Sequence, residues 1–198
     1  DYVEGKYAEG NGLHEQKATE WHRIALAALS LGGEPTSIGK DAKGEEINLI
    51  ADGTYNRGLT QELGQQGING WIWGLITLDS MSYKVPEEAY YSRKEIITEI
   101  IKRQHEDGGF SLGGIKGDPD ITAMAVQALA PYYNSQEKYT YVSLDTEKQV
   151  TLSIREIVDK ALECLSSMQG EKGDFSAYGA YNAESTAQVI IAVCALGI

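Results

Sequence analysis

The sequence has few of the residues from which disulfides and metal sites are built. It contains 2 cysteines and 3 histidines, His14, His22 and His105, and none of them stands at the paired spacing of a zinc site. Cys164 and Cys194 lie inside apolar, helix-like runs, where a thiol behaves as a small hydrophobic side chain. Their distances from the turn between two antiparallel helices differ by about 9 Å in height, which exceeds the reach of a disulfide. We therefore expect two buried free thiols, no bound metal and no cofactor.

Positive charge is also scarce. The chain has 17 lysines and arginines against 29 aspartates and glutamates, a formal net charge of -12. Such a balance repels a phosphate backbone and anionic lipid, so nucleic acid is excluded as a partner. No run approaches the roughly 20 consecutive apolar residues of a membrane span, so we expect no direct membrane insertion. Asp1 opens the chain without a methionine or an apolar leader, which favours a mature or excised fragment.

What remains is the composition of an ordinary folded protein. Hydrophobic residues make up 42% and charged residues 23% of the 198 residues, proportions that are typical of a globular domain. A chain of this length is sufficient for one domain, and no low-complexity linker divides it. We expect residues 1–198 to form a single domain.

Two kinds of helical segment alternate along the chain. The first kind is apolar on nearly every side, and it covers residues 21–31, 71–78, 121–129 and 186–196, of which all but 71–78 are rich in alanine. The second kind has one apolar stripe at the spacing of an amphipathic helix, and it covers residues 93–104 and 154–168. A helix that is apolar all round must be covered on every side, whereas a striped helix has one side in water. The alternation predicts inner helices wrapped by outer ones.

Two further expectations follow from this layering. Ala125, Ala128, Ile190 and Val193 should be buried, because they lie on the inner helices. The glycine-rich segments between the helices should be irregular, and they cover residues 32–70, 79–92, 106–119, 132–150 and 170–183.

The second half of the chain contains an internal repeat. In each copy a glutamine ends a striped helix, a glycine turn and a phenylalanine follow, and an acid with Thr-Ala opens an apolar helix. The landmarks are Gln104, Gly108, Phe110, Asp120 and Thr122 in the first copy, and Gln169, Gly173, Phe175, Glu184 and Thr186 in the second. The glutamines and the phenylalanines are each 65 residues apart, and the threonines 64. A constant period marks a repeat architecture.

These landmarks resemble the prenyltransferase and squalene-oxidase-type repeat of terpenoid cyclases and protein prenyltransferases. The resemblance runs from Trp21 to Leu196 and includes the segments 71–79, 118–132 and 184–189. It is closest to repeat domains of secreted and surface-anchored bacterial proteins. The resemblance implies an all-α fold of the α/α toroid type, with inner and outer helices in a partial ring. It also implies a location outside the cell or on its surface.

The resemblance raises a catalytic hypothesis for the run Asp118-Pro119-Asp120-Ile121. Class II terpene cyclases carry a similar Asp-x-Asp-Asp run, whose middle aspartate protonates an alkene or epoxide, and Asp120 occupies that position beside Asp118. Here Ile121 stands in place of the third aspartate. The alternative interpretation is structural: Asp118 caps a helix, Pro119 takes its first turn, and Asp120 faces the positive end of the helix dipole.

We place a ligand site at the openings of the inner helices. In a hairpin repeat these helices run parallel, so the segments 106–119 and 170–183 should meet at one end, here called the mouth. The residues there that could stack on a ligand or bind it through hydrogen bonds are Phe110, Asp118, Asp120, Phe175, Tyr178, Tyr181 and Glu184. The acids leave little attraction for an anion. The expected partner is therefore a neutral or cationic small molecule, glycan or protein.

Two classes of function are consistent with this sequence. The first is a non-catalytic extracellular or cell-surface binding domain with its ligand at the mouth. The alternative is an isoprenoid enzyme of the class II terpene cyclase or prenyltransferase type, with Asp120 as the acid. Ile121 and the shortage of lysine and arginine near the helix openings disfavour the enzyme, because a diphosphate substrate needs cationic partners.

Overall fold

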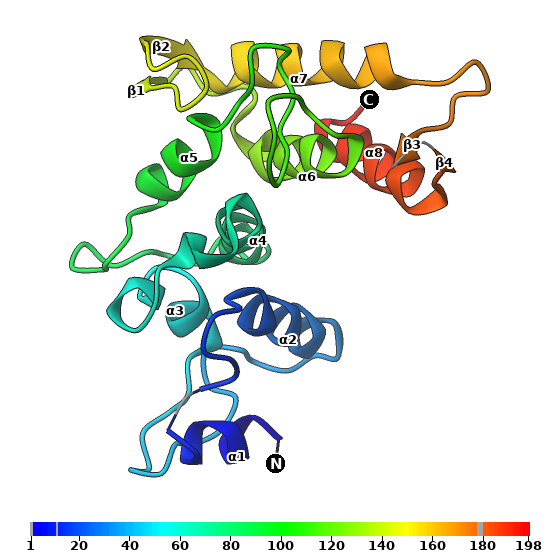
Figure 1. Cartoon of the computed structure of the whole chain (residues 1–198). Helices are drawn as coiled ribbons and strands as arrows, with labels where there is room; N and C mark the ends of the chain where they lie inside the picture. The colour runs from blue at the N-terminus through cyan, green and yellow to red at the C-terminus, as the bar shows by residue number, and fades with distance from the viewer. Residues whose placement is uncertain (1, 11, 178–179) are drawn as a thin grey trace. The chain divides into compact units, whose positions relative to one another are not determined.

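The computed structural model describes residues 2–10, 12–177 and 180–198. The chain divides into two compact units, Asp1–Ile96 (unit 1) and Ile97–Ile198 (unit 2). The division falls inside helix α5 (Arg93–Ile101), and both units are drawn in Figure 1. The single domain expected from the composition stays a prediction.

Unit 1 is built around helix α2, which packs against α3 and α4. Its elements are α1 (Tyr2–Ala8), α2 (Thr19–Ser30), α3 (Leu49–Gly53), α4 (Ile68–Asp79) and the 3-10 turns η1 (Arg57–Leu59) and η2 (Leu63–Gln66). A Cβ atom on Gly53 would collide with the side chain of Trp21 in α2. A Cβ atom on Gly70 would collide with the Leu63 carbonyl oxygen. Glycine at these two positions lets backbone segments approach more closely than any side chain would allow.

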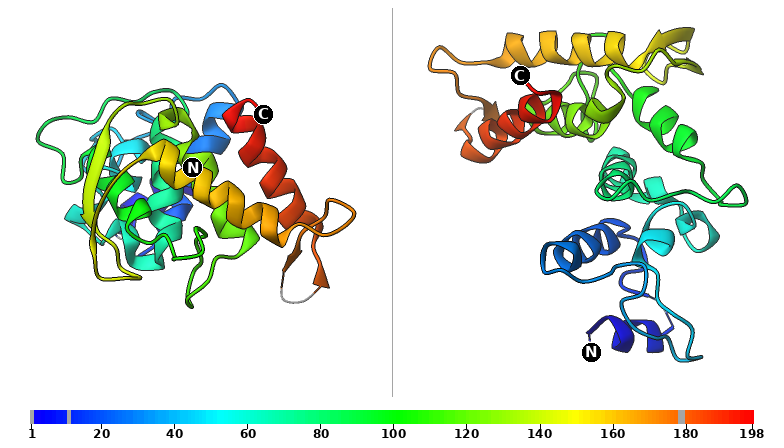
Figure 2. Two further views of the ribbon diagram at one scale, coloured as in Figure 1. Left: turned by 90° about the horizontal axis from the view of Figure 1, so that it is seen from above. Right: turned by 180° about the vertical axis from the view of Figure 1, so that it is seen from behind.

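Unit 2 is centred on helix α6, which packs against both α7 and α8. Its elements are α6 (Pro119–Leu129), the 3-10 turn η3 (Ala130–Tyr132), β1 (Lys138–Val142), β2 (Gln149–Ser153), α7 (Ile154–Met168), β3 (Ser176–Ala177), β4 (Ala180–Tyr181) and α8 (Ala183–Leu196). Figures 1 and 2 show α7 running along one side of α6 and α8. Because α6 lies between two helices, most of its side chains are buried.

The ends of α7 and α8 follow from local sequence. At the start of α7, Ser153 and Glu156 form a capping box, in which each side chain binds the backbone N–H of the other. At the start of α8, the Asn182 side chain accepts a hydrogen bond from the Ser185 N–H at 3.0 Å. Helix α8 ends at Gly197, whose φ of +78° is the left-handed conformation that glycine adopts at helix ends.

The fold is mixed, which corrects the expectation of an all-α toroid. Helix makes up 49% of the structure, and the segment 132–150, expected to be irregular, contributes to a two-stranded antiparallel sheet of β1 and β2. In β1 the side chains of Tyr139 and Tyr141 are buried and their neighbours are exposed, as in a strand with one buried face. Thr140 and Thr151 bind each other across the sheet at 2.9 Å. This alternation spans only five residues, too few to stand out beside the longer helical patterns.

The expected inner layer is confirmed in α6 and wrong for part of α8. Ala125 and Ala128 are 0% and 1% exposed. Val193 is half-buried, whereas Ile190 is 56% exposed. Helix α8 packs on α6 with one face, and its opposite face carries Ile190 into solvent within the described part of unit 2. An apolar sequence on every side of a helix therefore does not establish that every side is covered.

Both cysteines are free thiols, as expected. Cys164 is buried in α7, whereas Cys194 is exposed on α8, so the expectation that both are buried is wrong for Cys194. Burial, together with the nearby charge of Asp107, raises the pKa of the Cys164 thiol to about 11. A thiol with so high a pKa stays protonated and unreactive near neutral pH.

Iodoacetamide should therefore distinguish the two thiols. At pH 8 we expect rapid alkylation of Cys194 in the folded protein and alkylation of Cys164 only after unfolding in urea. Peptide mass spectrometry after timed quenching measures both rates. The Cys194→Ser variant should lose the fast adduct and serves as the control. Equal labelling of Cys164 and Cys194 in the folded chain would contradict the burial of Cys164.

Candidate functional site

The repeat in the sequence corresponds to a repeated hydrogen-bond framework in unit 2. The Gln104 side-chain amide donates to the Gly108 carbonyl oxygen at 2.8 Å, and the Gln169 amide donates to the Gly173 carbonyl oxygen at 3.3 Å. Gly108 and Gly173 have φ values of +86° and +80°, a conformation that favours glycine. The two turns are therefore built in the same way.

A threonine hydroxyl closes each turn. Thr122 Oγ1 accepts a hydrogen bond from the Phe110 N–H at 2.9 Å, and Thr186 Oγ1 accepts one from the Phe175 N–H at 3.0 Å. The Thr122 hydroxyl in turn donates to the Phe110 carbonyl oxygen at 3.1 Å. The Thr186 hydroxyl donates to the Asn182 carbonyl oxygen at the same distance. The Phe-to-Thr spacing thus encodes a contact between each loop and the helix that follows it.

This framework places both phenylalanines of the predicted ligand site in the interior. Phe110 is 0% exposed and Phe175 is 4% exposed. Beside Phe110, a Cβ atom on Gly109 would lie 2.6 Å from the Gly117 Cα atom and 2.8 Å from Cys164 Sγ. The first loop is therefore packed tightly against its own second half and against α7. Neither ring presents an open face on which a ligand could stack.

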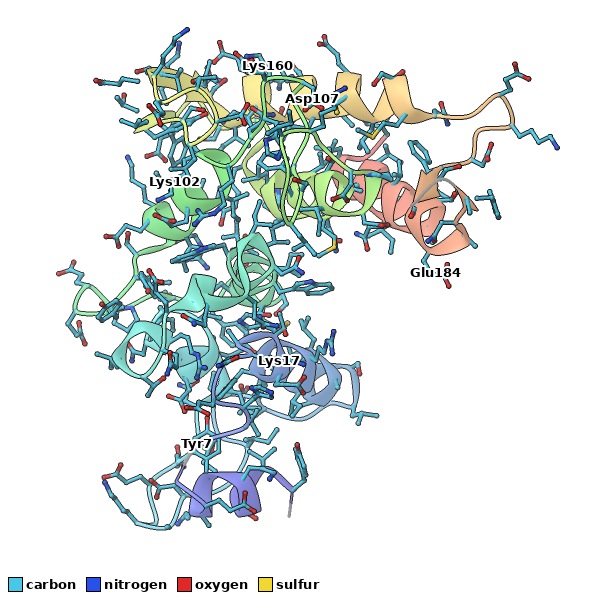
Figure 3. The ribbon with its side chains drawn as sticks, in the orientation of Figure 1. Tyr7, Lys17, Lys102, Asp107, Lys160 and Glu184 are labelled. Atoms are coloured by element: carbon cyan, nitrogen blue, oxygen red, sulfur yellow. The ribbon has the colours of Figure 1, made fainter. Side chains whose placement is uncertain are left out.

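The predicted acids occupy the first turns of α6 and α8. Asp118 Oδ1 accepts a hydrogen bond from the Ile121 N–H at 2.8 Å, so Asp118 caps α6 as the structural interpretation predicts. Burial raises the pKa of the Asp118 carboxyl, and the bond from Ile121 opposes that shift. Asp120 is half-buried in the first turn, and Ile121, at the position of the missing third aspartate, is buried. Glu184 is exposed at the start of α8 and is labelled in Figure 3.

The predicted tyrosines lie in the loop before α8. Tyr181 in β4 is 64% exposed, and Tyr178 lies outside the described residues. The short strand β3 of the same loop contacts both α6 and α8, so the structure brings this loop against both helices. Among the described residues predicted for the mouth, Tyr181 and Glu184 are the exposed ones.

A second candidate site lies wholly within unit 1. It is a pocket of about 650 Å³, a volume within the range of small-molecule sites. Its lining includes Tyr7 of α1, Trp21 of α2, Asp52 of α3 and Arg57 of η1. We call it the Tyr7 pocket, after the residue that is labelled in Figure 3.

Tyr7 links two other residues of this pocket. Its hydroxyl donates to Asp52 Oδ2 at 2.7 Å and accepts from the Trp21 indole N–H at 2.8 Å. Burial and the charge of Asp52 raise the pKa of Tyr7 well above its usual range, so the phenol keeps its proton. Burial also raises the pKa of the Asp52 carboxyl. The second oxygen, Asp52 Oδ1, forms no hydrogen bond within the described residues and remains available as an acceptor.

Arg57 is a buried cation in the same wall. Its side chain lies over the Trp21 ring, 4.2 Å from the ring centroid, and the residue is 3% exposed. One terminal nitrogen donates to the Glu15 carbonyl oxygen at 2.9 Å. The guanidinium Nε atom is buried and has no hydrogen-bond partner among the described residues. Because Nε has almost no accessible surface, Arg57 contributes its positive charge to the pocket and no free N–H group.

His22 is a buried residue of α2 that contacts the end of α3, the helix that carries Asp52. Its Nε2 atom lies 2.6 Å from the Gly53 carbonyl oxygen, and the residue is 0% exposed. A carbonyl oxygen only accepts, so Nε2 carries the hydrogen and Nδ1 is unprotonated in the neutral ring. Burial lowers the pKa of His22 to about 4. A neutral His22 therefore joins α2 to the end of α3, next to Asp52.

No pattern in the sequence indicated the Tyr7 pocket. Tyr7 and Asp52 are 45 residues apart, and Asp52 and Arg57 lie in the segment 32–70, which was expected to be irregular. Helix α3 has five residues, fewer than an apolar period needs to become visible. The one local signal is Asn48, whose side chain caps α3 by accepting the Ala51 N–H at 2.9 Å.

Comparison with models of protein families, with curated proteins and with solved structures finds no match for this chain. Within residues 2–10, 12–177 and 180–198, no three His, Cys, Asp or Glu side chains are grouped as a metal site requires. In the same residues, no helix is both long and apolar enough to cross a bilayer. Any function assigned to this chain therefore rests on the geometry of its sites.

Replacing Thr122 should destabilise the first repeat turn. Thr122→Val preserves shape but leaves the buried Phe110 N–H unpaired, which should cost about 1–3 kcal/mol. Hydrogen exchange of the α6 amides measures this loss within unit 2. The matched Thr186→Val variant should lose less, because Thr186 is only half-buried. Unchanged exchange in Thr122→Val would show that the hydroxyl does not hold the turn.

The buried His22 should make unit 1 sensitive to mild acid. Its folded pKa of about 4 lies below the ordinary value of 6.5, so its stabilising contribution is complete above pH 6.5 and is lost as the pH falls toward 4. The loss between pH 7 and pH 5 should be about 2 kcal/mol. Urea unfolding, followed by the fluorescence of the tryptophans in unit 1, measures it at each pH. His22→Gln should remove this part of the pH dependence. If the free energy of unfolding of the variant still falls with pH as steeply as that of the unaltered chain, His22 is not the group responsible.

Proposed function

We propose that this chain is a binding domain that holds a neutral, hydroxyl-bearing small molecule, such as a sugar unit, in the Tyr7 pocket. The observation that carries the proposal is the unused acceptor Asp52 Oδ1, in a pocket whose lining also includes the cations Lys43 and Arg57. A carboxylate oxygen accepts hydrogen bonds and donates none, so it favours a ligand that offers donors such as hydroxyl groups.

The charge of the pocket supports a ligand without net negative charge. Its lining includes three carboxylates, Glu15, Asp41 and Asp52, and two cations, Lys43 and Arg57. The carboxylates outnumber the cations, and the chain as a whole has a net charge of -12. An anionic ligand would meet repulsion from both sources. A neutral ligand avoids this penalty, and a cationic one is the second choice.

One aromatic side chain of the lining supports a ligand with a flat face. Tyr7 is half-buried in the pocket wall, whereas Trp21 is 2% exposed and has Arg57 over its ring. Sugar rings present flat patches of C–H groups that pack on aromatic side chains. The hydrogen bond from the Trp21 indole already orders Tyr7, so a ligand that contacts Tyr7 loses less free energy to immobilising the protein.

The same reasoning moves the proposed site from the mouth to the Tyr7 pocket. At the mouth, Phe110 and Phe175 are buried and Asp118 is engaged as a helix cap. Among the described mouth residues, Tyr181 and Glu184 are the exposed ones, and two such groups are too few for a small-molecule site. The repeat framework is consistent with kinship to the prenyltransferase and squalene-oxidase-type repeat. We propose that kinship, and with it a location on the outside of a bacterial cell.

The proposal is tested by titrating the full chain with glucose, galactose, N-acetylglucosamine, cellobiose and chitobiose. Glucuronate is the anionic counterpart, and intrinsic tryptophan fluorescence and calorimetry are the readouts. We expect at least one neutral sugar to bind more tightly than glucuronate. Asp52→Asn should weaken that binding about tenfold or more, because it removes a charged acceptor.

A matched variant distinguishes the two candidate sites. Glu184→Gln makes the same change from carboxylate to amide at the mouth and should leave the dissociation constant unaltered. Asn at position 52 still accepts the Tyr7 hydroxyl, so the pocket should keep its shape. Loss of binding in Glu184→Gln with full binding in Asp52→Asn would overturn the assignment to the Tyr7 pocket. Absence of binding by every sugar would overturn the proposed ligand class.

A further inference from the structure

Three side chains of unit 2 form a line of hydrogen bonds that the repeat does not explain. His105 Nε2 lies 2.9 Å from Ser111 Oγ, and His105 Nδ1 lies 3.1 Å from Asp145 Oδ1. A serine hydroxyl, an imidazole and a carboxylate joined in this order are the components of nucleophilic acyl transfer, wherever they occur in a sequence. His105 and Ser111 lie in the loop between α5 and α6, and Asp145 lies in the turn between β1 and β2.

Backbone contacts hold the carboxylate in place. The second oxygen of Asp145 accepts the Glu106 N–H at 2.9 Å. The neighbouring Leu144 N–H donates to the carbonyl oxygen of Lys102, at the end of α5, at 2.8 Å. Lys102 is labelled in Figure 3. The hydrogen bond to His105 and that from Glu106 lower the pKa of the Asp145 carboxyl, so it stays ionised.

An ionised Asp145 fixes the protonation of the neutral imidazole. A carboxylate only accepts, so the hydrogen of neutral His105 lies on Nδ1 and points to Asp145. Nε2 then has a free lone pair directed to Ser111 Oγ and can accept its proton. The Ser111 hydroxyl also lies 3.0 Å from the Gly113 carbonyl oxygen, which is the competing acceptor for that proton.

The second copy of the repeat shows that folding of the turn does not require the histidine. The position equivalent to His105 is Gly170, and the position equivalent to Ser111 is Ser176. This copy nevertheless forms the same bonds from Gln169 to Gly173 and from Phe175 to Thr186. The His105 cluster is therefore an addition to a scaffold that closes without it.

The loop around Ser111 supplies two further features of an acyl-transfer site. The backbone N–H groups of residues 112–114 donate no hydrogen bonds within the described structure, and such groups can stabilise the oxyanion of a tetrahedral intermediate. Leu112 and Ile115 are 59% and 80% exposed. These exposed apolar side chains follow Ser111 in the same loop, and they suit an apolar acyl chain.

We propose that Ser111 and His105, positioned by Asp145, hydrolyse carboxylic esters that carry a short apolar acyl group. Ser111 Oγ attacks the ester carbonyl carbon while its proton passes to His105 Nε2. The C–O bond to the alcohol then breaks, and His105 returns the proton to the departing oxygen. Water attacks the acyl-serine with His105 again as base, which releases the carboxylic acid and restores Ser111. No cofactor is needed.

The test uses the full chain with p-nitrophenyl butyrate and, separately, a fluorophosphonate that labels activated serines. We expect hydrolysis above the rate in buffer and a single fluorophosphonate adduct, located on Ser111 by mass spectrometry. Ser111→Ala should lower turnover by about 10³-fold or more and abolish the adduct. The matched control Ser176→Ala changes the equivalent serine of the second copy and should leave both unchanged.

The role of Asp145 has a spectroscopic readout. In Asp145→Asn the amide can donate to His105 Nδ1, so the neutral ring should shift its hydrogen to Nε2 and turnover should fall. The ¹⁵N shifts of the His105 ring report the tautomer directly. A tautomer that does not change in this variant would remove Asp145 from the proposal.

Other outcomes show whether His105, Ser111 and Asp145 catalyse hydrolysis or only stabilise the loop. The proposal is wrong if the unaltered chain forms no fluorophosphonate adduct on Ser111. It is also wrong if turnover persists in Ser111→Ala. Sugar binding is tested with Asp52→Asn in unit 1, whereas ester hydrolysis is tested with Ser111→Ala in unit 2. The failure of sugar binding and the failure of ester hydrolysis are therefore independent results.

Discussion

The backbone of Phe110 lies in the interior of unit 2, where water cannot satisfy its polar groups, and the loop depends on how they are paired. The Thr122 hydroxyl accepts from the Phe110 N–H and donates to the Phe110 carbonyl oxygen, which also accepts the Asp118 N–H at 2.9 Å. One side chain of α6 thereby fixes the loop that precedes it. An unpaired buried amide costs more than a hydrogen bond returns, so the threonine is required wherever this loop is buried.

This constraint separates the scaffold of the chain from the groups that can act on other molecules. Residues that hold the repeat, such as Phe110 and Asp118, are buried or fully engaged, although their chemistry in isolation suggested a ligand site. The side chains that remain available to other molecules take no part in the repeated hydrogen bonds. Asp52 belongs to the short helix α3 of unit 1, and the His105 side chain meets a carboxylate from the turn between β1 and β2. Function is therefore sought among the side chains that the repeat does not engage.

The helices were predictable because each long segment carries its own signal. The predicted segments 121–129 and 154–168 correspond to α6 (Pro119–Leu129) and α7 (Ile154–Met168). Asp118 and Pro119 also marked the start of α6 correctly. The sheet and α3 were missed, because five residues give too short a pattern. The pocket was missed for another reason: Tyr7 and Asp52 are far apart in the sequence and unremarkable individually.

The sequence by itself determined the helical periods, the caps and the repeated turn, because these depend on residues within one or two turns of one another. Tertiary structure decided which apolar faces are covered: it buried Ala125 and exposed Ile190 on helices of similar composition. It also decided which polar atoms remain unpaired, as at Asp52 and Arg57. Pairing of that kind depends on the distance between atoms of remote segments, and only the packed chain sets that distance.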